Sequence, residues 1–217
     1  MTSRKLIILA KAPIVGHAKS RMIPLLGSEG AARLHQELTH WLLTKMGNSP
    51  DYETELWCAS DIDHPFFVEC AAEFAITLKL QQGDDLGERQ LFAMMSGLAN
   101  AKSVVMVGSD VASLIMSDIE NAFQAIEQGK QVVIAPAEDG GYGLIGGSRV
   151  AKDLFSGIPW GTHQVYEAMV NNLNRLEFEW QALPEVWDLD CPEELVRLGR
   201  HPLISEALLK ILEVNGL

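Results

Sequence analysis

The sequence lacks the features that would direct it to a membrane or to a disulfide scaffold. In its 217 residues, no run approaches the roughly 20 consecutive apolar residues that a membrane-spanning helix needs. Lys11 and Pro13 interrupt the apolar segment at residues 6–10 before it could form the core of a signal peptide. The three cysteines lie far apart and form no CxxC pair, so they are expected to be reduced thiols rather than disulfides or zinc ligands.

Positive charge is also scarce. The 17 Lys and Arg residues face 29 Asp and Glu residues, which gives a formal net charge of −12 at pH 7. Because such a negative surface repels nucleic acid and anionic lipid headgroups, we expect neither as a partner. With 47% hydrophobic residues, the composition predicts a cytoplasmic globular protein in which residues 1–217 form one domain. The oligomeric state stays open, a homodimer included.

The amino-terminal segment is the exception to this negative charge. The first 28 residues contain no Asp or Glu, although five Lys and Arg residues occur there: Arg4, Lys5, Lys11, Lys19 and Arg21. Since part of this segment surrounds Pro13 and Gly16 directly after an apolar strand, the pattern favours a phosphate-facing loop. The alternative is an ordinary solvated basic terminus.

Apolar runs and helical periodicities alternate along the whole chain. Strands are predicted at residues 5–10, 56–59, 76–80, 104–107, 132–135 and 142–145, with an edge or protruding strand within 177–187. Helices are predicted at residues 28–47, 66–74, 86–101, 117–128, 163–176 and 192–213, the fourth with Ser117 and Glu120 as its capping box. Such alternation predicts an α/β fold with a mostly parallel sheet covered by helices on both faces.

In open parallel sheets, ligands bind beyond the carboxyl ends of the strands, so the loops there are the informative ones. Two familiar phosphate motifs can be rejected. A Walker A reading of residues 13–20 fails because Pro13 and Ala18 stand where glycines are needed. Residues 141–146 match GxGxxG, but they have the pattern of a strand rather than of a turn into a helix.

A basic loop and separated carboxylates remain after these exclusions. This combination suits a nucleoside di- or triphosphate bound through a divalent cation, since Mg²⁺ is usually held by one or two carboxylates plus phosphate oxygens and water. Asp110 and Asp190 are the preferred metal ligands, with Asp188 in reserve, and Lys19 and Arg21 add positive charge. Alternatively, Asp110 is a turn former, and Asp190 caps a helix that opens at residues 191–192.

Taken in order, seven segments resemble the bacterial radical-SAM/selenodomain-associated transferase 1 family, which belongs to the nucleotide-diphospho-sugar transferase (GT-A) superfamily. They are residues 9–13, 16–21, 83–89, 108–110, 136–142, 159–162 and 188–195. The resemblance implies a three-layer α/β/α sandwich around a mostly parallel mixed sheet.

The resemblance also implies roles for individual residues. Phosphate and nucleotide binding is implied for Lys11, Gly16, Lys19, Arg21, Asp85 and Arg89. Mg²⁺ or Mn²⁺ would be held by Asp110 and Asp190. A pocket for the acceptor is implied around Asp139, Gly140, Gly141 and Tyr142.

The chain departs from the family pattern in the loop that carries Asp110. Relatives typically have a proline two residues after this aspartate, whereas this chain has Val111 and Ala112. The missing proline predicts a looser loop.

These residues predict a Mg²⁺-dependent transferase that uses a nucleotide donor and a small-molecule acceptor, with Lys19, Arg21, Asp110 and Asp139 in the catalytic centre. Nucleotidyl transfer to a phosphorylated acceptor is preferred, because such an acceptor needs no general base. Glycosyl transfer from a nucleotide-diphospho-sugar is the alternative, and its sugar hydroxyl would need a base, for which Asp139 is the best candidate. A non-catalytic nucleotide-binding protein is a third hypothesis, motivated by the altered loop at Val111.

Overall fold

The computed structural model describes residues 2–200 and 205–214 of the chain. The strands are β1 (Thr2–Lys11), β2 (Glu53–Ala59), β3 (Thr77–Leu80), β4 (Ala101–Gly108), β5 (Val132–Pro136), β6 (Tyr142–Gly147) and β7 (Trp180–Ala182). The α-helices are α1 (Ile23–Met46), α2 (Pro65–Phe74), α3 (Leu86–Leu98), α4 (Met116–Glu127), α5 (Val165–Arg175), α6 (Pro192–Gly199) and α7 (Glu206–Val214). Two short 3-10 helices, η1 (Ser20–Met22) and η2 (Lys152–Leu154), complete the elements.

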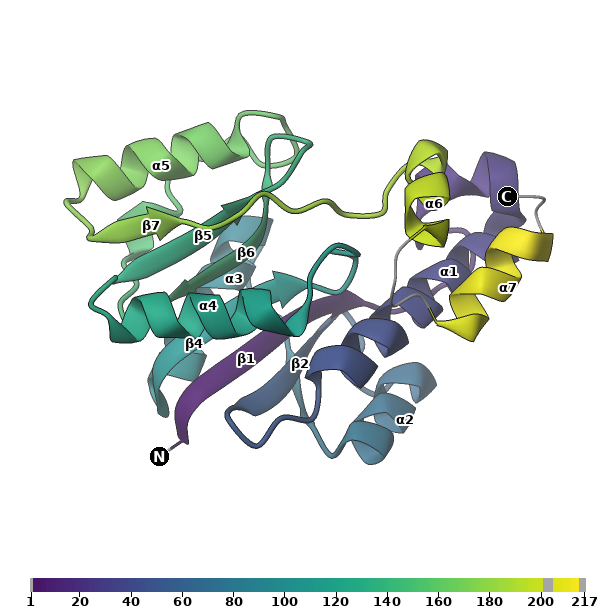
Figure 1. Ribbon diagram of the computed structural model, residues 1–217, viewed down its shortest axis with the longest axis horizontal. Coiled ribbons are helices and arrows are strands. Elements are labelled where there is room, and N and C mark those ends of the chain that lie inside the picture. Colours follow the sequence, from purple (N-terminus) through teal and green to yellow (C-terminus); the bar gives the residue numbers. More distant parts are fainter. Residues whose placement is uncertain (1, 201–204, 215–217) are drawn as a thin grey trace.

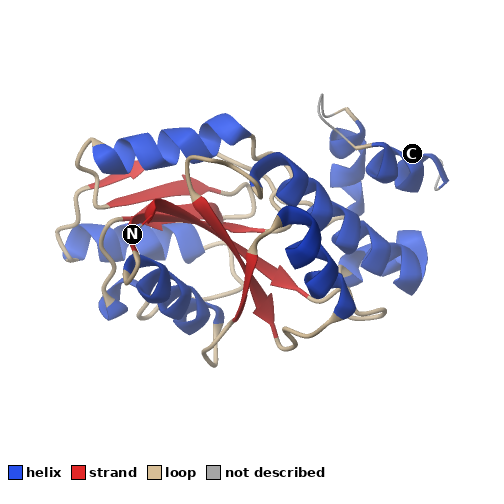
Figure 2. Ribbon diagram, turned by 90° about the horizontal axis from the view of Figure 1, so that it is seen from below, coloured by secondary structure: helices blue, strands red, loops and turns tan. Residues whose placement is uncertain are grey.

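The strands form one mixed sheet in the order β3-β2-β1-β4-β6-β5-β7. Strand β6 runs antiparallel to both of its neighbours, β4 and β5, and the other pairs are parallel. Helices cover both sides of this sheet (Figure 2). The α/β fold with a mostly parallel mixed sheet is therefore confirmed.

The alternation of side chains along β1 shows how the layers form. Leu6 and Ile8 are fully buried against a cluster that includes residues of α1, α2 and α4. Ile7, between them, is fully buried on the opposite face, in a cluster with residues of α3 and α5. Because successive side chains of a strand point to opposite faces, a continuous apolar run predicts a strand buried on both sides, as observed.

A third apolar cluster lies beside the sheet, where residues of α6 and α7 gather with residues of α1 (Figure 1). Trp187 and Leu189, from the segment that leads into α6, belong to the same cluster. This cluster thus holds the chain at residues 187–189 against α1.

Several predicted boundaries need correction. The helix predicted to end at residue 101 ends at Leu98, because Ala101 already pairs with β1. Helix α4 begins before Ser117, and its cap is the Asp118 carboxylate, which accepts the Ile115 N–H at 2.9 Å, so the predicted capping box is wrong. Helix α1 starts at residue 23, but Gly27 breaks it with φ 70°, so the regular helix runs from residue 28 as predicted. The predicted helix over 192–213 is two helices, and its residues 201–204 lie outside the described part of the chain.

The cysteines are thiols in the structure, as expected. All three cysteines are free, two of them buried. Burial raises the pKa of the Cys58 and Cys70 thiols to about 12, so both stay protonated at neutral pH. Within residues 2–200 and 205–214, no helix is long and apolar enough to cross a bilayer.

Candidate functional site

The loops that carry the predicted site residues leave the sheet at the carboxyl ends of its parallel strands. Strands β1 and β4 are parallel neighbours and end together, with Leu9 opposite Gly108. The Ser109 N–H continues this pairing by donating to the Leu9 carbonyl at 3.0 Å. The loops that follow β1 and β4 therefore leave the sheet side by side, as expected for the carboxyl ends of parallel strands.

Lys19, Asp110 and Asp190 form an ion-paired group, the Lys19 triad, at this end of the sheet. The Lys19 Nζ donates to Asp110 Oδ2 at 3.0 Å and to Asp190 Oδ1 at 2.6 Å. The Lys19 side chain is only 4% exposed, whereas the two carboxylates are 36% and 40% exposed. Arg21 lies at the rim, with its guanidinium 3.8 Å from Asp190 Oδ2 and its side chain 71% exposed.

Burial and charge act in opposite directions on the triad. Burial lowers the pKa of Lys19, but the two carboxylates outweigh it, so the pKa lies above its ordinary value. Burial likewise raises the pKa of Asp110, and the Lys19 ammonium outweighs it, so this pKa lies below its ordinary value. Both groups are therefore charged at neutral pH.

Asp188 lies in a more negative environment. Burial, followed by the charges of Asp110, Asp190 and Asp139, raises its pKa to about 6. The predicted carboxylates thus share one electrostatic neighbourhood in which negative charge is incompletely balanced.

Hydrogen bonds fix the loop after β4 to the segment before α6. The Ser113 hydroxyl donates to the Trp187 carbonyl at 3.1 Å and accepts the Trp187 N–H at 2.8 Å. The Leu189 N–H donates to the Asp110 carbonyl at 3.0 Å. Val111 and Ala112, which replace the family's usual sequence, are buried. Backbone pairing and burial therefore anchor this segment, and a looser loop than in relatives with the proline stays a prediction.

Asp190 is held from its other side by the start of α6. The Glu194 carboxylate accepts the N–H groups of Asp190 and Cys191 at 2.5 and 2.8 Å. The N-cap position belongs to Cys191, so Asp190 does not cap the helix and its side chain faces Lys19 instead. The capping interpretation of Asp190 is therefore wrong by one residue.

The first loop is supported by a histidine that the sequence analysis did not single out. His35 of α1 has its Nε2 atom 2.9 Å from the Lys11 carbonyl oxygen. Because a carbonyl can only accept, Nε2 carries the proton. Burial lowers the pKa of His35, which keeps the ring neutral. The Lys11 side chain itself is exposed, and Gly16 supplies a positive φ of 82° in the turn that follows.

The other predicted nucleotide-binding residues lie at the start of α3. The Asp85 carboxylate accepts the Glu88 N–H at 2.8 Å and so caps this helix. The Arg89 Nε donates to the Gly83 carbonyl at 3.0 Å and closes the preceding turn. Both residues therefore have structural roles at the start of α3. Asp85 is exposed and Arg89 is half-exposed.

The predicted acceptor residues form a tight turn between β5 and β6. The Asp139 Oδ1 atom accepts the Gly141 N–H at 2.8 Å, which fixes the turn. Gly140 has φ 87°, and a Cβ there would lie 2.1 Å from the His163 carbonyl oxygen, so only glycine fits. The Tyr142 hydroxyl donates to Gln90 of α3, a contact between the acceptor loop and α3 that sequence patterns do not signal.

Trp160 joins the turn at residues 139–142 to the first turn of α3. Its ring lies 6.4 Å from that of Tyr142 in an edge-on arrangement. It also packs so close to Gly87 that a Cβ at this glycine would lie 2.6 Å from the indole. Two motifs of the family resemblance, at residues 83–89 and 159–162, are therefore in direct contact.

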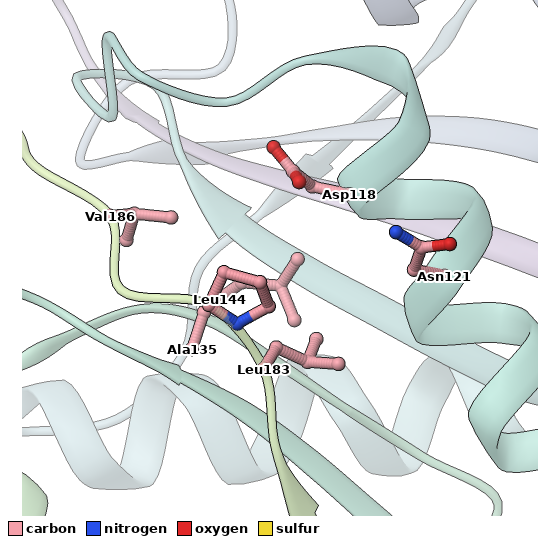
Figure 3. Close-up of a pocket in the computed structure, with 7 residues that line it drawn as sticks. Asp118, Asn121, Ala135, Leu144, Leu183 and Val186 are labelled. Carbon is pink, nitrogen blue, oxygen red and sulfur yellow. The ribbon is translucent and has the colours of Figure 1, made fainter.

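A small cavity elsewhere is no ligand site. It lies between α4, the β5–β6 pair and residues 183–186, and Asp118 and Asn121 provide its polar wall (Figure 3). Its accessible volume of about 10 Å³ leaves room for one water at most. The chemistry of the molecule is therefore not located there.

The residues of the triad fit a divalent cation that arrives with phosphates. Within the described residues, no three His, Cys, Asp or Glu side chains are already arranged as a complete metal-binding group. Asp110 and Asp190 instead each bind Lys19 through one oxygen, and the second oxygen of Asp190 lies 3.8 Å from the Arg21 guanidinium. Two carboxylates are enough for Mg²⁺ or Mn²⁺ when phosphate oxygens and water complete the coordination.

The family model described as "Uncharacterized protein conserved in bacteria (DUF2064)" matches residues 42–162, more than half of the chain. This chain belongs to the DUF2064 family. The match includes Asp110 and the turn at residues 139–142, whereas Lys19 and Asp190 lie outside the matched residues. A comparison with curated proteins finds no match.

Solved structures share the fold of this DUF2064 protein. A protein from Desulfovibrio desulfuricans G20 with the provisional name nucleotide-diphospho-sugar transferase is 27% identical, with TM-score 0.88 over 99% of this chain and 97% of that chain. The 4-diphosphocytidyl-2C-methyl-D-erythritol synthase of Anaerococcus prevotii DSM 20548 is 8% identical, with TM-score 0.60 over 90% and 94% of the two chains. The Mycobacterium tuberculosis glucosyl-3-phosphoglycerate synthase, solved with Mn²⁺, UDP and glucosyl-3-phosphoglycerate, is 10% identical, with TM-score 0.51 over 100% and 81%. The chain thus shares its fold with these three structures.

Proposed function

We propose that this protein is a Mg²⁺- or Mn²⁺-dependent transferase that takes a nucleotide donor and a small-molecule acceptor. The observation that carries the proposal is the convergence of Lys19 with Asp110 and Asp190, which are 91 and 171 positions away in the sequence. Phosphoryl and nucleotidyl transfer depends mostly on positioning and charge compensation, and cationic and anionic side chains gathered at one sheet edge supply both. The resemblance to the radical-SAM/selenodomain-associated transferase 1 family agrees with this proposal.

Each part of the site would contribute a different interaction. Lys19 and Arg21 would bind the phosphates of the donor, and Asp110 and Asp190 would hold the divalent cation, with Asp188 beside them. The cation would neutralise negative charge on the phosphates and on the leaving group. The turn at residues 139–142, fixed by the Asp139–Gly141 hydrogen bond and by the contact of Tyr142 with Gln90, would form the wall of the acceptor pocket.

Nucleotidyl transfer from a nucleoside triphosphate to a phosphorylated acceptor is our preferred reaction. An acceptor phosphate is already anionic and attacks without a general base. A reaction that does need a base would have to use Asp139, and one oxygen of Asp139 already accepts the Gly141 N–H. The name of the Desulfovibrio desulfuricans G20 protein favours the second candidate, transfer of a sugar from a nucleotide-diphospho-sugar, in which Asp139 would have to act as base.

Thermal unfolding with and without Mg²⁺ tests the shared part of both reactions. Nucleoside triphosphates and nucleotide-diphospho-sugars should raise the melting temperature only when Mg²⁺ is present, and Asp110→Asn should abolish the increase. Asp153→Asn is the matched control, because it makes the same change at an exposed position of η2. Stabilisation that is independent of metal and of Asp110 would contradict the proposal and favour a protein that only binds nucleotides.

Product analysis separates the two reactions. Nucleotidyl transfer releases pyrophosphate from a triphosphate, whereas glycosyl transfer releases a nucleoside diphosphate from a diphospho-sugar. Asp110→Asn should lower either rate by about 100-fold or more, because it removes charge stabilisation at the centre of the site. Metal-dependent binding without either product would leave the non-catalytic hypothesis.

A further inference from the structure

Lys19 is the most buried member of its triad, and it occupies the space between the two carboxylates. Its side chain is 4% exposed, and its ammonium group contacts both Asp110 and Asp190. The two oxygens that it contacts belong to the carboxylates that suit a divalent cation best. A buried lysine therefore already provides the positive charge that these carboxylates need.

The backbone is held in an uncommon conformation to place Lys19 there. Lys19 has φ 45° and ψ 50°, the left-handed region that residues other than glycine rarely adopt. Its carbonyl accepts the Met22 N–H at 2.8 Å, which locks the turn at the start of η1. Arg21, two residues later, has its side chain 71% exposed. The loop thus directs one cation inward to the carboxylates and leaves the other at the surface.

A free divalent cation and the Lys19 ammonium compete for the same oxygens. Placing a second cation beside a buried, hydrogen-bonded ammonium is opposed by repulsion between like charges. A nucleotide donor changes this balance, because its phosphates offer Lys19 a new anionic partner and supply further ligands for the cation.

We propose that Lys19 is the resident counter-ion of the Asp110–Asp190 pair, and that the site therefore accepts a divalent cation together with the phosphates of the donor rather than as a free ion. Lys19 holds the two carboxylates together before the donor binds and moves to the phosphates when it binds. The part about the donor rests on the proposed function, whereas the counter-ion role of Lys19 does not.

The affinity of the protein for Mn²⁺ in the absence of nucleotide tests the counter-ion role. It is measured from the electron paramagnetic resonance signal of the unbound ion. Lys19→Met should bind free Mn²⁺ at least about tenfold more tightly than the wild type, because the competing charge is gone. Lys152→Met is the matched control: it removes the same charge at an exposed position of η2, away from the triad, and its Mn²⁺ affinity should change by about threefold or less. An unchanged or weaker Mn²⁺ affinity of Lys19→Met would overturn the proposal.

The same measurement with a nucleoside triphosphate examines the donor. Mn²⁺ affinity of the wild type should rise with the nucleotide, and the rise should be smaller in Lys19→Met. If the nucleotide has no effect on the wild type while Lys19→Met still binds free Mn²⁺ more tightly, the counter-ion role stands and the proposed function fails. If the nucleotide strengthens Mn²⁺ binding to the wild type but Lys19→Met gains nothing without it, the proposed function stands and the counter-ion role fails.

Lys19→Gln keeps the experiment decisive if Lys19→Met does not fold without metal. The glutamine amide can still donate to one carboxylate but carries no charge, so the same tightening of Mn²⁺ binding is expected. Recovery of folded Lys19→Met on addition of Mn²⁺ would support the counter-ion role, because the metal would then replace the missing charge.

Discussion

Replacing Ser113 with alanine tests how the two segments that carry Asp110 and Asp190 are held in register. The Ser113 hydroxyl accepts the Trp187 N–H at 2.8 Å and donates to the Trp187 carbonyl at 3.1 Å. The carbonyl keeps a second donor in the variant, since the Ser113 N–H also reaches it at 3.3 Å. The Trp187 N–H would lose its partner in a residue that is only 8% exposed. An unsatisfied buried donor costs about 1–3 kcal/mol, so we expect Ser113→Ala to lower the free energy of unfolding by about 2 kcal/mol.

Urea unfolding measures this change, and hydrogen exchange of the Trp187 amide locates it. Ser117→Ala is the matched control, because Ser117 lies four positions later and is exposed on α4. Its effect should stay within about 0.5 kcal/mol. The Mn²⁺ affinity in the presence of nucleotide should also fall in Ser113→Ala, since Asp110 and Asp190 are carried by the two segments that Ser113 joins. Equal stability of the two variants, with unchanged exchange at Trp187, would refute this account of how the loops are aligned.

Two further changes have predictable effects on stability. Asp188→Asn should raise the free energy of unfolding at pH 8 in the presence of EDTA. Burial and neighbouring carboxylates raise the pKa of Asp188 to about 6, so its ionisation at pH 8 destabilises the folded state. The full shift corresponds to about 3 kcal/mol, and partial solvent contact reduces the expected gain to about 1–2 kcal/mol. This gain should be complete above about pH 6 and vanish below about pH 4, and a gain that does not depend on pH would contradict it. Gly140→Ala should destabilise the protein by about 3 kcal/mol or more, because its Cβ would lie 2.1 Å from the His163 carbonyl oxygen. Gly157→Ala is the control: Gly157 has φ 70° and nothing within 4 Å of the added Cβ, so this variant should lose only about 1 kcal/mol. Equal losses of stability in thermal melts would argue against the clash.

Much of the architecture could be predicted from local patterns. Apolar runs such as residues 104–107 indicate strands buried on both faces, and the helical spacing after residue 28 indicates α1, because burial repeats with the period of each element. The boundaries of the elements are less predictable from local patterns. The start of α4 was misplaced because several polar residues near it could cap a helix, and only the three-dimensional path of the chain selects Asp118.

The site could be predicted only as a set of candidates. The sequence determined which loops contain charged side chains and that these loops follow strands, and parallel pairing then implies that they share an edge. It could not show that Asp85 caps α3 or that His35 supports Lys11, since both depend on where a helix ends or packs.

By itself, the sequence determined the alternation of strands and helices, the surplus of negative charge and the basic first loop. Only the tertiary structure decided that β6 runs against its neighbours, that Ser113 fastens the loop after β4 to Trp187, and that Lys19 lies between Asp110 and Asp190. The reason is physical. Local periodicity records which side chains are buried, whereas the meeting of charges 91 and 171 positions apart depends on strand order, on a left-handed residue in a turn and on hydrogen bonds between distant segments.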